Sequence, residues 1–171
     1  PATVNEAAAT ELAAHAARAD TADLSRLSIE ELANLEITSV SKRPERLADA
    51  AASVFVIGNE DLRRSGVQSL PEALRLAPNL NVQRVDSTDY GISSRGLNGF
   101  ESANKLLVLV DGRSVYSPFF AGVEWSQQHV PLGDVDRIEV ISGPGGALWG
   151  ANAVNGVINI ITRKAADTPG G

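Results

Sequence analysis

The chain has 171 residues, 43% of them hydrophobic, which is enough for one domain with a buried core. It has no cysteine and only two histidines, His15 and His129, which excludes disulfides, cysteine-ligated metals and a histidine-rich metal centre. The net charge is −6, and residues 1–36 hold seven acids against two bases, so the rest of the chain is nearly neutral and lacks the basic face that nucleic acids require.

Residues 1–35 are predicted to form a leader that is partly helical or disordered. Its first 23 residues are rich in alanine but contain a single leucine, Leu12, so a helix there has little apolar surface to bury. A Ser-x-x-Glu capping box begins at Ser28 and predicts a short helix over residues 29–35.

Residues 36–52 are predicted to be an extended segment followed by a linker. The segment Glu36-Ile37-Thr38-Ser39-Val40 is β-prone and contains no proline. The polar stretch after it contains Pro44, which rules out a continuous helix.

The domain body is predicted over residues 53–164, with residues 165–171 as a disordered tail. Apolar or alternating runs predict strands over 53–57, 80–85, 92–96, 105–115, 137–142 and 157–162. The Asp111-Gly112 pair predicts a hairpin turn within the fourth of these runs.

Short helices are predicted between the first strands. Asn59 is expected to cap a helix that ends at Gly66, and a capping box at Ser69 opens a second helix that must end before Pro78. Helical turn signals also occur at 131–134. Strands interrupted by short helices predict an α+β fold with a mixed sheet.

A glycine-rich segment links the last two predicted strands, in the stretch RIEVISGPGGALWGANAVNGVINIITRK. A phosphate-binding loop would also follow a strand, but this segment has no Gly-Lys-Ser/Thr word and Pro144 removes one amide donor. The alternative is a compact link in which glycine permits positive φ and close backbone approach.

The same stretch closely resembles the closing signature of the plug domain of TonB-dependent outer-membrane transporters. Other plug words follow the family's order: EITSVSKRPERLADAAASVFVIGNEDL, SLPEALRLAPNLNVQ, SRG and LLVLVDGR. The resemblance covers residues 36–164. It implies a plug lodged in the lumen of a 22-stranded barrel, which gates the lumen, contributes to ligand binding and couples to TonB for energised uptake.

The resemblance gives residues 36–40 a role. Glu36, Ile37, Thr38, Ser39 and Val40 lie where the family has its TonB box, which the TonB C-terminal domain grasps. A proline-free extended segment can add to the edge of a partner's sheet through main-chain hydrogen bonds. The alternative is that these residues are only the first strand of the plug or part of its linker.

The resemblance also implies contacts with the barrel wall and with cargo. Arg95 matches the arginine of the family's Arg-Gly word, which pairs with barrel glutamates; without a barrel it would be solvated or locally paired. The second family arginine is replaced here by Ser142, and Glu139 is a further candidate barrel contact. The candidate ligand-binding residues lie in loops that follow strands: Asp86, Tyr90, Asn98, Tyr116, Phe119 and Phe120. The alternative is that the aromatic residues pack against barrel or plug.

The family carries metal chelates such as ferric siderophores and vitamins, so the expected partners are the receptor's own barrel, TonB and a small ligand, with no cofactor, metal site or nucleic acid. The chain stops where the first barrel strand would begin, and it is expected to be a plug that is soluble when isolated, with a tendency to self-associate. In the complete receptor it would lie in the bacterial outer membrane, with its N-terminus in the periplasm.

A free-standing periplasmic binding module with a plug fold is the alternative function. An enzyme is not expected, because no nucleophile–base constellation is readable.

Overall fold

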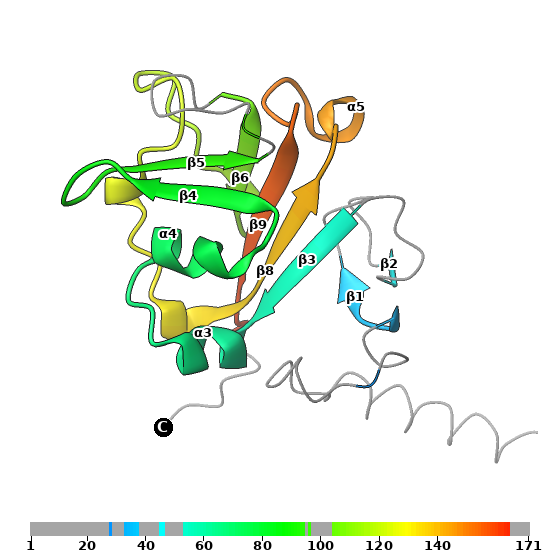
Figure 1. Ribbon diagram of the computed structural model, residues 1–171. Helices are drawn as coiled ribbons and strands as arrows, with labels where there is room; N and C mark the ends of the chain where they lie inside the picture. The colour runs from blue at the N-terminus through cyan, green and yellow to red at the C-terminus, as the bar shows by residue number, and fades with distance from the viewer. Residues whose placement is uncertain are drawn as a thin grey trace, which may run out of the picture.

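A computed structural model describes residues 28, 33–37, 45–46, 53–94, 96 and 104–164 (Figure 1). The strands are β1 (Glu36–Ile37), β2 (Glu45–Arg46), β3 (Ser53–Gly58), β4 (Leu80–Arg84), β5 (Tyr90–Ser94), β6 (Leu106–Val110), β7 (Arg113–Ser114), β8 (Val135–Ser142) and β9 (Gly156–Thr162). The α-helices are α3 (Asn59–Ser65), α4 (Leu70–Ala73) and α5 (Gly146–Trp149), and the 3-10 turns are η3 (Leu74–Leu76), η4 (Trp125–Gln127) and η5 (Leu132–Asp134).

A five-stranded sheet in the order β3-β8-β9-β6-β7 forms the centre of the domain. Strands β6 and β9 are parallel, and the other neighbours are antiparallel. Two further ribbons, β1-β2 and β4-β5, have two strands each. The predicted α+β class with a mixed sheet is therefore confirmed.

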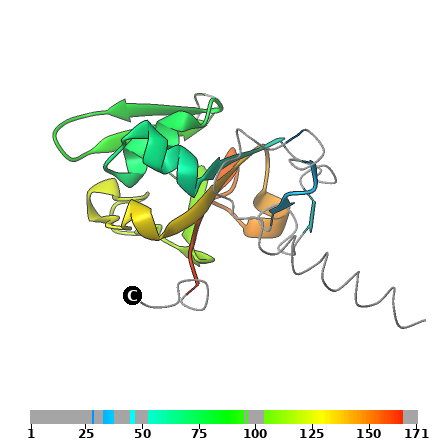
Figure 2. The same cartoon turned by 90° about the horizontal axis from the view of Figure 1, so that it is seen from below.

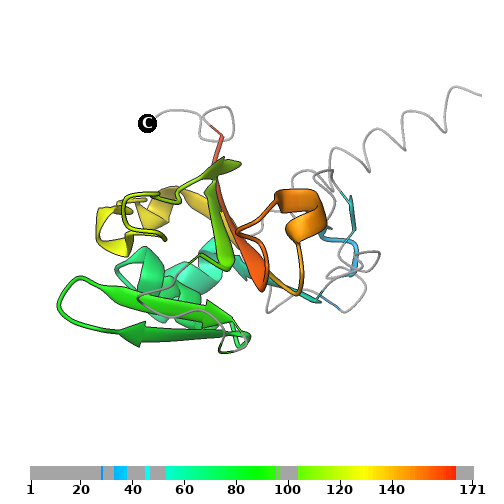
Figure 3. The same ribbon diagram turned by 90° about the horizontal axis from the view of Figure 1, so that it is seen from above.

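Elements cover both faces of the central sheet. The β4-β5 hairpin, α3 and α4 lie on one face, while α5 and β1 lie on the other (Figures 2 and 3). The larger core lies between the central sheet and the elements on the first of these faces. There, buried residues of the sheet such as Ile138, Val140 and Ile158 pack with Leu74 and Ile92. A smaller cluster under α5 contains Leu107, Leu109, Ile141, Ala153 and Val157.

The alternation of apolar residues explains how one strand serves both layers. On β8, Ile138 and Val140 belong to the larger core, whereas Ile141 belongs to the smaller one. Side chains of a strand point alternately to opposite faces, so a strand covered on both sides is apolar almost throughout. The strand predictions for 53–57, 80–85, 137–142 and 157–162 agree with the structure to within two residues.

The turn between β6 and β7 has the predicted geometry. Asp111 and Gly112 both have positive φ, 49° and 77°, as a two-residue hairpin turn requires. Val110 pairs with Arg113 directly across it.

The predicted cap at Asn59 was wrong, and the predicted cap at Ser69 was correct in position but not in its side-chain hydrogen bond. Asn59 is the first residue of α3 rather than its cap, and the amide of the preceding Gly58 donates to Asp61 Oδ2 at 3.0 Å. Ser69 does precede α4, but its side chain makes no capping hydrogen bond. The ends were predicted correctly, since Gly66 closes α3 with φ 68° and the turn η3 stops before Pro78.

The glycine segment forms a compact link that contains the four-residue helix α5, which the sequence did not predict. The amides of Gly143 and Gly145 donate to the carbonyls of Asn155 and Ala153, at 3.1 and 2.8 Å. These two amides are used within the chain, which agrees with the interpretation as a compact link. A phosphate-binding loop would need such amides to be free for the anion.

Candidate functional site

The N-terminal strand β1 holds the first two residues of the predicted TonB box. Glu36 is exposed, whereas the side chain of Ile37 is fully buried. β1 pairs antiparallel with β2, with Glu36 opposite Arg46 and Ile37 opposite Glu45. Glu36 and Ile37 are therefore extended, as predicted, and pair with Glu45 and Arg46 of the predicted linker. Thr38, Ser39 and Val40 lie outside the described residues.

The candidate ligand residues come from two places. Asp86 and Tyr90 belong to the β4-β5 hairpin, and Tyr116, Phe119 and Phe120 belong to the segment after β7. Asn98 lies outside the described residues. The charge of Glu124, in the segment after β7, contributes to raising the pKa of Asp89 in the hairpin turn.

The hairpin turn is organised by Asp86. Its Oδ1 accepts hydrogen bonds from the amides of Thr88 and Asp89, both at 2.8 Å, and these amides lower the pKa of the Asp86 carboxyl. Desolvation and the neighbouring Asp86 raise the pKa of Asp89. Arg84 donates to the carbonyls of Asp86 and Ser87, at 2.9 and 2.6 Å. Asp86 thus has a structural task in the turn, whatever else it contacts.

Tyr90 is engaged at both ends of its side chain. Its hydroxyl donates to Glu72 Oε1 at 3.0 Å, and the guanidinium of Arg84 lies 5.8 Å from the ring centroid. Glu72 in turn pairs with Arg75 at 2.9 Å. These contacts connect the hairpin to α4. Tyr90 is half-buried, so only part of its side chain is accessible to a ligand.

Phe119 has the opposite character. Its exposed fraction is 103%, the highest among the exposed large apolar residues. The turn that carries it is closed by two backbone hydrogen bonds between Ser117 and Gly122, at 2.8 and 3.3 Å, and Ala121 adopts φ 54°. Phe119 is therefore displayed on a short closed turn, while Tyr116 and Phe120 are half-buried.

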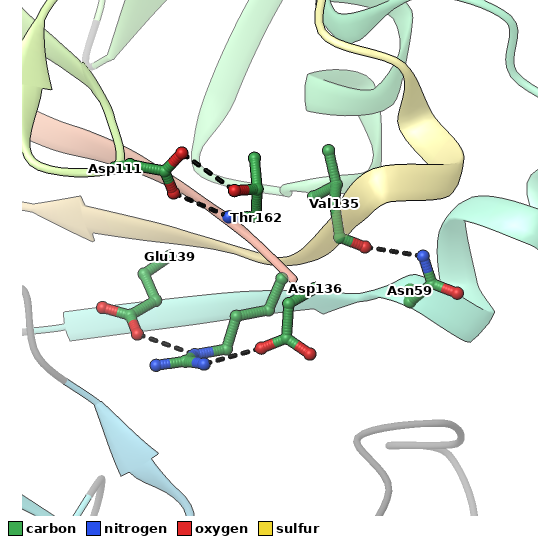
Figure 4. Close-up of polar contacts among 7 residues, drawn as sticks. Asn59, Asp111, Val135, Asp136, Glu139 and Thr162 are labelled. Atoms are coloured by element: carbon green, nitrogen blue, oxygen red, sulfur yellow. Dashed lines mark hydrogen bonds and ion pairs between the residues drawn. The ribbon is translucent and has the colours of Figure 1, made fainter. Parts of the chain in front are cut away.

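Of the two candidate barrel contacts, Arg95 lies outside the described residues and Glu139 is completely buried. The Glu139 carboxylate accepts from Arg137 Nε at 2.9 Å, and Arg137 Nη1 donates to Asp136 Oδ2 at 2.8 Å (Figure 4). Ser142, which stands at the place of the second family arginine, accepts a hydrogen bond from Asn79 Nδ2. The pairing of Glu139 with a barrel cation stays a prediction.

The sequence analysis missed one polar cluster, at the end of β9. Asp111, Asn59 and Arg163 hold this strand end through side-chain hydrogen bonds. Figure 4 shows the bonds of Asp111 with Thr162 and of Asn59 with Val135. Asn59 had been interpreted as a helix cap and Asp111 as a turn residue. The partners lie 51 and 104 residues away along the chain, so no local pattern could have indicated them.

The described part of the chain contains no group of three or more His, Asp or Glu side chains that could hold a metal ion. No helix in the same residues is long and apolar enough to cross a membrane.

The family model described as TonB-dependent Receptor Plug Domain matches residues 46–157. The chain is 34% identical over 134 residues to the vitamin B12 transporter BtuB of Vibrio vulnificus, covering 78% of this chain and 21% of that protein. It is 40% identical over 124 residues to the iron-regulated outer membrane virulence protein of Vibrio cholerae, covering 69% of this chain and 18% of that one. The chain thus spans about a fifth of the length of these curated relatives.

Solved structures have the same fold. The ferric enterobactin receptor PfeA of Pseudomonas aeruginosa superposes with a TM-score of 0.52 at 32% identity, over 67% of this chain and 18% of that one. FpvA of P. aeruginosa, solved with a bound ferric pyoverdine, gives a TM-score of 0.59 at 21% identity, over 75% of this chain and 16% of that one.

Proposed function

The chain belongs to the family of TonB-dependent receptor plug domains, and we propose that it is the gating plug of an outer-membrane transporter. In this role it occludes the lumen of a β-barrel supplied by the rest of the receptor, contributes to cargo binding and couples to TonB. The observation that carries the proposal is the family match over residues 46–157, whose described part includes most of the mixed sheet and its covering elements.

The proposed cargo is a small metal chelate or vitamin. The relatives are named as a vitamin B12 transporter and as ferric siderophore receptors, and none of these names describes an enzyme. Transport and reception, rather than catalysis, are therefore the functions carried over to this chain.

Removal of the plug from the complete receptor tests the gating role. Deleting residues 46–157 is expected to open the lumen, so that cells admit large antibiotics and lose cargo-specific uptake. The measurement compares antibiotic sensitivity and uptake of labelled cyanocobalamin or ferric enterobactin with those of cells that carry the intact receptor at equal surface expression. Unchanged permeability in the deleted receptor would contradict gating.

For coupling, we propose residues 36–40 as the TonB-binding segment. The pairing of β1 with β2 supports this proposal, because it means that Glu36 and Ile37 already have the extended conformation that strand addition needs. TonB would replace β2 as the pairing partner or add to the other edge of β1.

A proline at position 37 is expected to weaken TonB binding about tenfold, because proline cannot donate the main-chain hydrogen bond of a strand ladder. Calorimetric titration of the full chain with a TonB C-terminal domain measures the affinity of wild type and Ile37→Pro. The matched control is Ser28→Pro, which places a proline outside the segment and is expected to bind as wild type. Equal affinity for Ile37→Pro would remove residues 36–40 from the interface.

For cargo, we propose Asp86, Tyr90, Asn98, Tyr116, Phe119 and Phe120 as the plug's share of the ligand surface. Phe119 is the residue whose side chain is most fully offered, since it is exposed on a closed turn. For contact with the barrel wall, we propose Arg95 and Glu139. The carboxylate of Glu139 already accepts a hydrogen bond from Arg137, so a barrel cation would have to share it.

Phe119→Ala is expected to leave the free energy of unfolding within about 0.5 kcal/mol of wild type, because this side chain is fully exposed among the described residues. In the complete receptor the same change is expected to weaken cargo binding roughly tenfold, as loss of an aromatic anchor does. Binding of cyanocobalamin and of ferric enterobactin is measured for each variant. The control is Leu148→Ala, another exposed apolar side chain, which belongs to α5. Full retention of binding by Phe119→Ala would exclude it as a contact.

A further inference from the structure

The end of β9 is held from one side by Asp111. The amide and the hydroxyl of Thr162 both donate to the Asp111 carboxylate, each at 2.8 Å. The Asp111 amide in turn donates to the carbonyl of Ile160 at 2.9 Å. The β6-β7 turn is therefore fixed to the neighbouring strand through both the backbone and the side chain of one residue.

The other side of the same strand end is held by Asn59. Its Oδ1 accepts from Arg163 Nη2 at 2.6 Å, and its Nδ2 donates to the carbonyl of Val135 at 2.6 Å. The amide of Arg163 donates to the carbonyl of Asp134 at 2.8 Å. Asn59 has an exposed fraction of only 4%, and its hydrogen bond to Val135 is buried, whereas its bond to Arg163 is partly buried.

The end of β9 has more hydrogen bonds from side chains than a strand needs in order to end. Strand ends that leave a sheet usually fray, because their backbone groups can bond to water. Here two of the hydrogen bonds involve a carboxylate and one involves a guanidinium, and charged partners make the stronger bonds. The side chains come from the β6-β7 turn and from the start of α3, which are far apart in sequence (Figure 4).

We propose that Asp111, Asn59 and Arg163 form an exit clasp, a set of positioning residues that fixes the direction in which the chain leaves the plug after β9. The proposal rests on the proposed function, in which the polypeptide after the plug is the barrel. None of the hydrogen bonds of the clasp involves β1 or β2. A partner that moves the N-terminal segment would therefore break none of these hydrogen bonds directly.

The absence of cysteine from the sequence allows a direct test with spin labels. One label is placed at Lys164→Cys, just beyond the clasp, and the other at Gln83→Cys, on the exposed side of β4. Electron–electron dipolar spectroscopy on the full chain then gives the distribution of distances between the exit and the hairpin. A closed clasp is expected to give a single narrow distribution.

Arg163→Ala removes the hydrogen bond between the guanidinium and Asn59 at an exposed position, and Asp111→Asn weakens the other side of the clasp while keeping a residue that tolerates positive φ. Each is expected to broaden the distribution about twofold, because the freed strand end samples more directions. The control, Asp134→Ala, removes a nearby carboxylate but keeps the carbonyl that Arg163 uses, and is expected to match wild type.

The melting temperature of each labelled protein separates positioning from mere stability. The proposal is supported if the distance distribution broadens in both clasp variants while the melting temperature and the NMR spectrum of the backbone amides outside the clasp stay as in wild type. A wild-type distribution in folded Arg163→Ala and Asp111→Asn overturns it. Because this test uses the chain without a barrel or TonB, failure of the clasp and failure of the gating proposal are distinguished.

Discussion

Gly156→Ala is expected to lower the free energy of unfolding by about 3 kcal/mol or more, which is enough to unfold a marginal domain. A Cβ at this position would lie 2.3 Å from the carbonyl oxygen of Ile141 and 3.4 Å from Leu106 Cδ1. The first of these atoms belongs to the backbone of β8, which β3 holds on its other side. The carbonyl cannot move away without disturbing two strand ladders.

Gly146→Ala is the matched control for this prediction. No atom lies within 4 Å of a Cβ built at Gly146, which is the first residue of α5. Alanine is the better helix former, so the control is expected to be neutral or to stabilise by up to about 1 kcal/mol. Urea denaturation followed by circular dichroism compares the two variants. An unfolding free energy for Gly156→Ala within 1 kcal/mol of wild type would refute the close backbone approach.

Arg137→Ala is expected to lower the free energy of unfolding by about 3–5 kcal/mol, because it removes the counter-charge of a completely buried carboxylate. Glu139 lies on β8, between Val56 of β3 and Asn159 of β9. The carboxylate itself has no exposed surface, so loss of the guanidinium leaves a buried charge. Urea denaturation again provides the measurement.

Two variants calibrate the prediction for Arg137. Glu60→Gln breaks the surface pair with Arg64, whose side chain is 46% exposed, and is expected to cost less than about 0.5 kcal/mol. The double variant Arg137→Met with Glu139→Leu removes both charges and is expected to recover most of the lost stability. If Arg137→Ala costs no more than Glu60→Gln, the buried pair has no stabilising role.

The strand pattern was the most predictable part of the fold. Leu106 to Val110 and Gly156 to Thr162 are apolar runs of strand length, and burial on both faces of the sheet requires that composition. The Asp111-Gly112 turn was equally readable, because few residue pairs tolerate two successive positive φ angles. These are signals that a few neighbouring residues carry by themselves.

The candidate sites were only partly predictable. The β-prone character of residues 36–40 indicated an extended segment, but nothing in the sequence indicated that Ile37 would be buried or paired with the linker at Glu45. The aromatic residues after β7 looked equivalent in sequence, whereas the closed turn between Ser117 and Gly122 exposes Phe119 and leaves Phe120 half-buried. Burial depends on what arrives from elsewhere in the chain.

By itself, the sequence determined where the strands run, where the turns fall and, through several words in order, the family to which the chain belongs. The tertiary structure decided what the polar residues do. Asn59 looked like a cap until Arg163 and Val135 were brought to it, and Glu139 looked available until Arg137 was found beside it. Backbone conformation follows from near neighbours along the chain, but a buried polar group is satisfied by whichever partner packing places within hydrogen-bond distance.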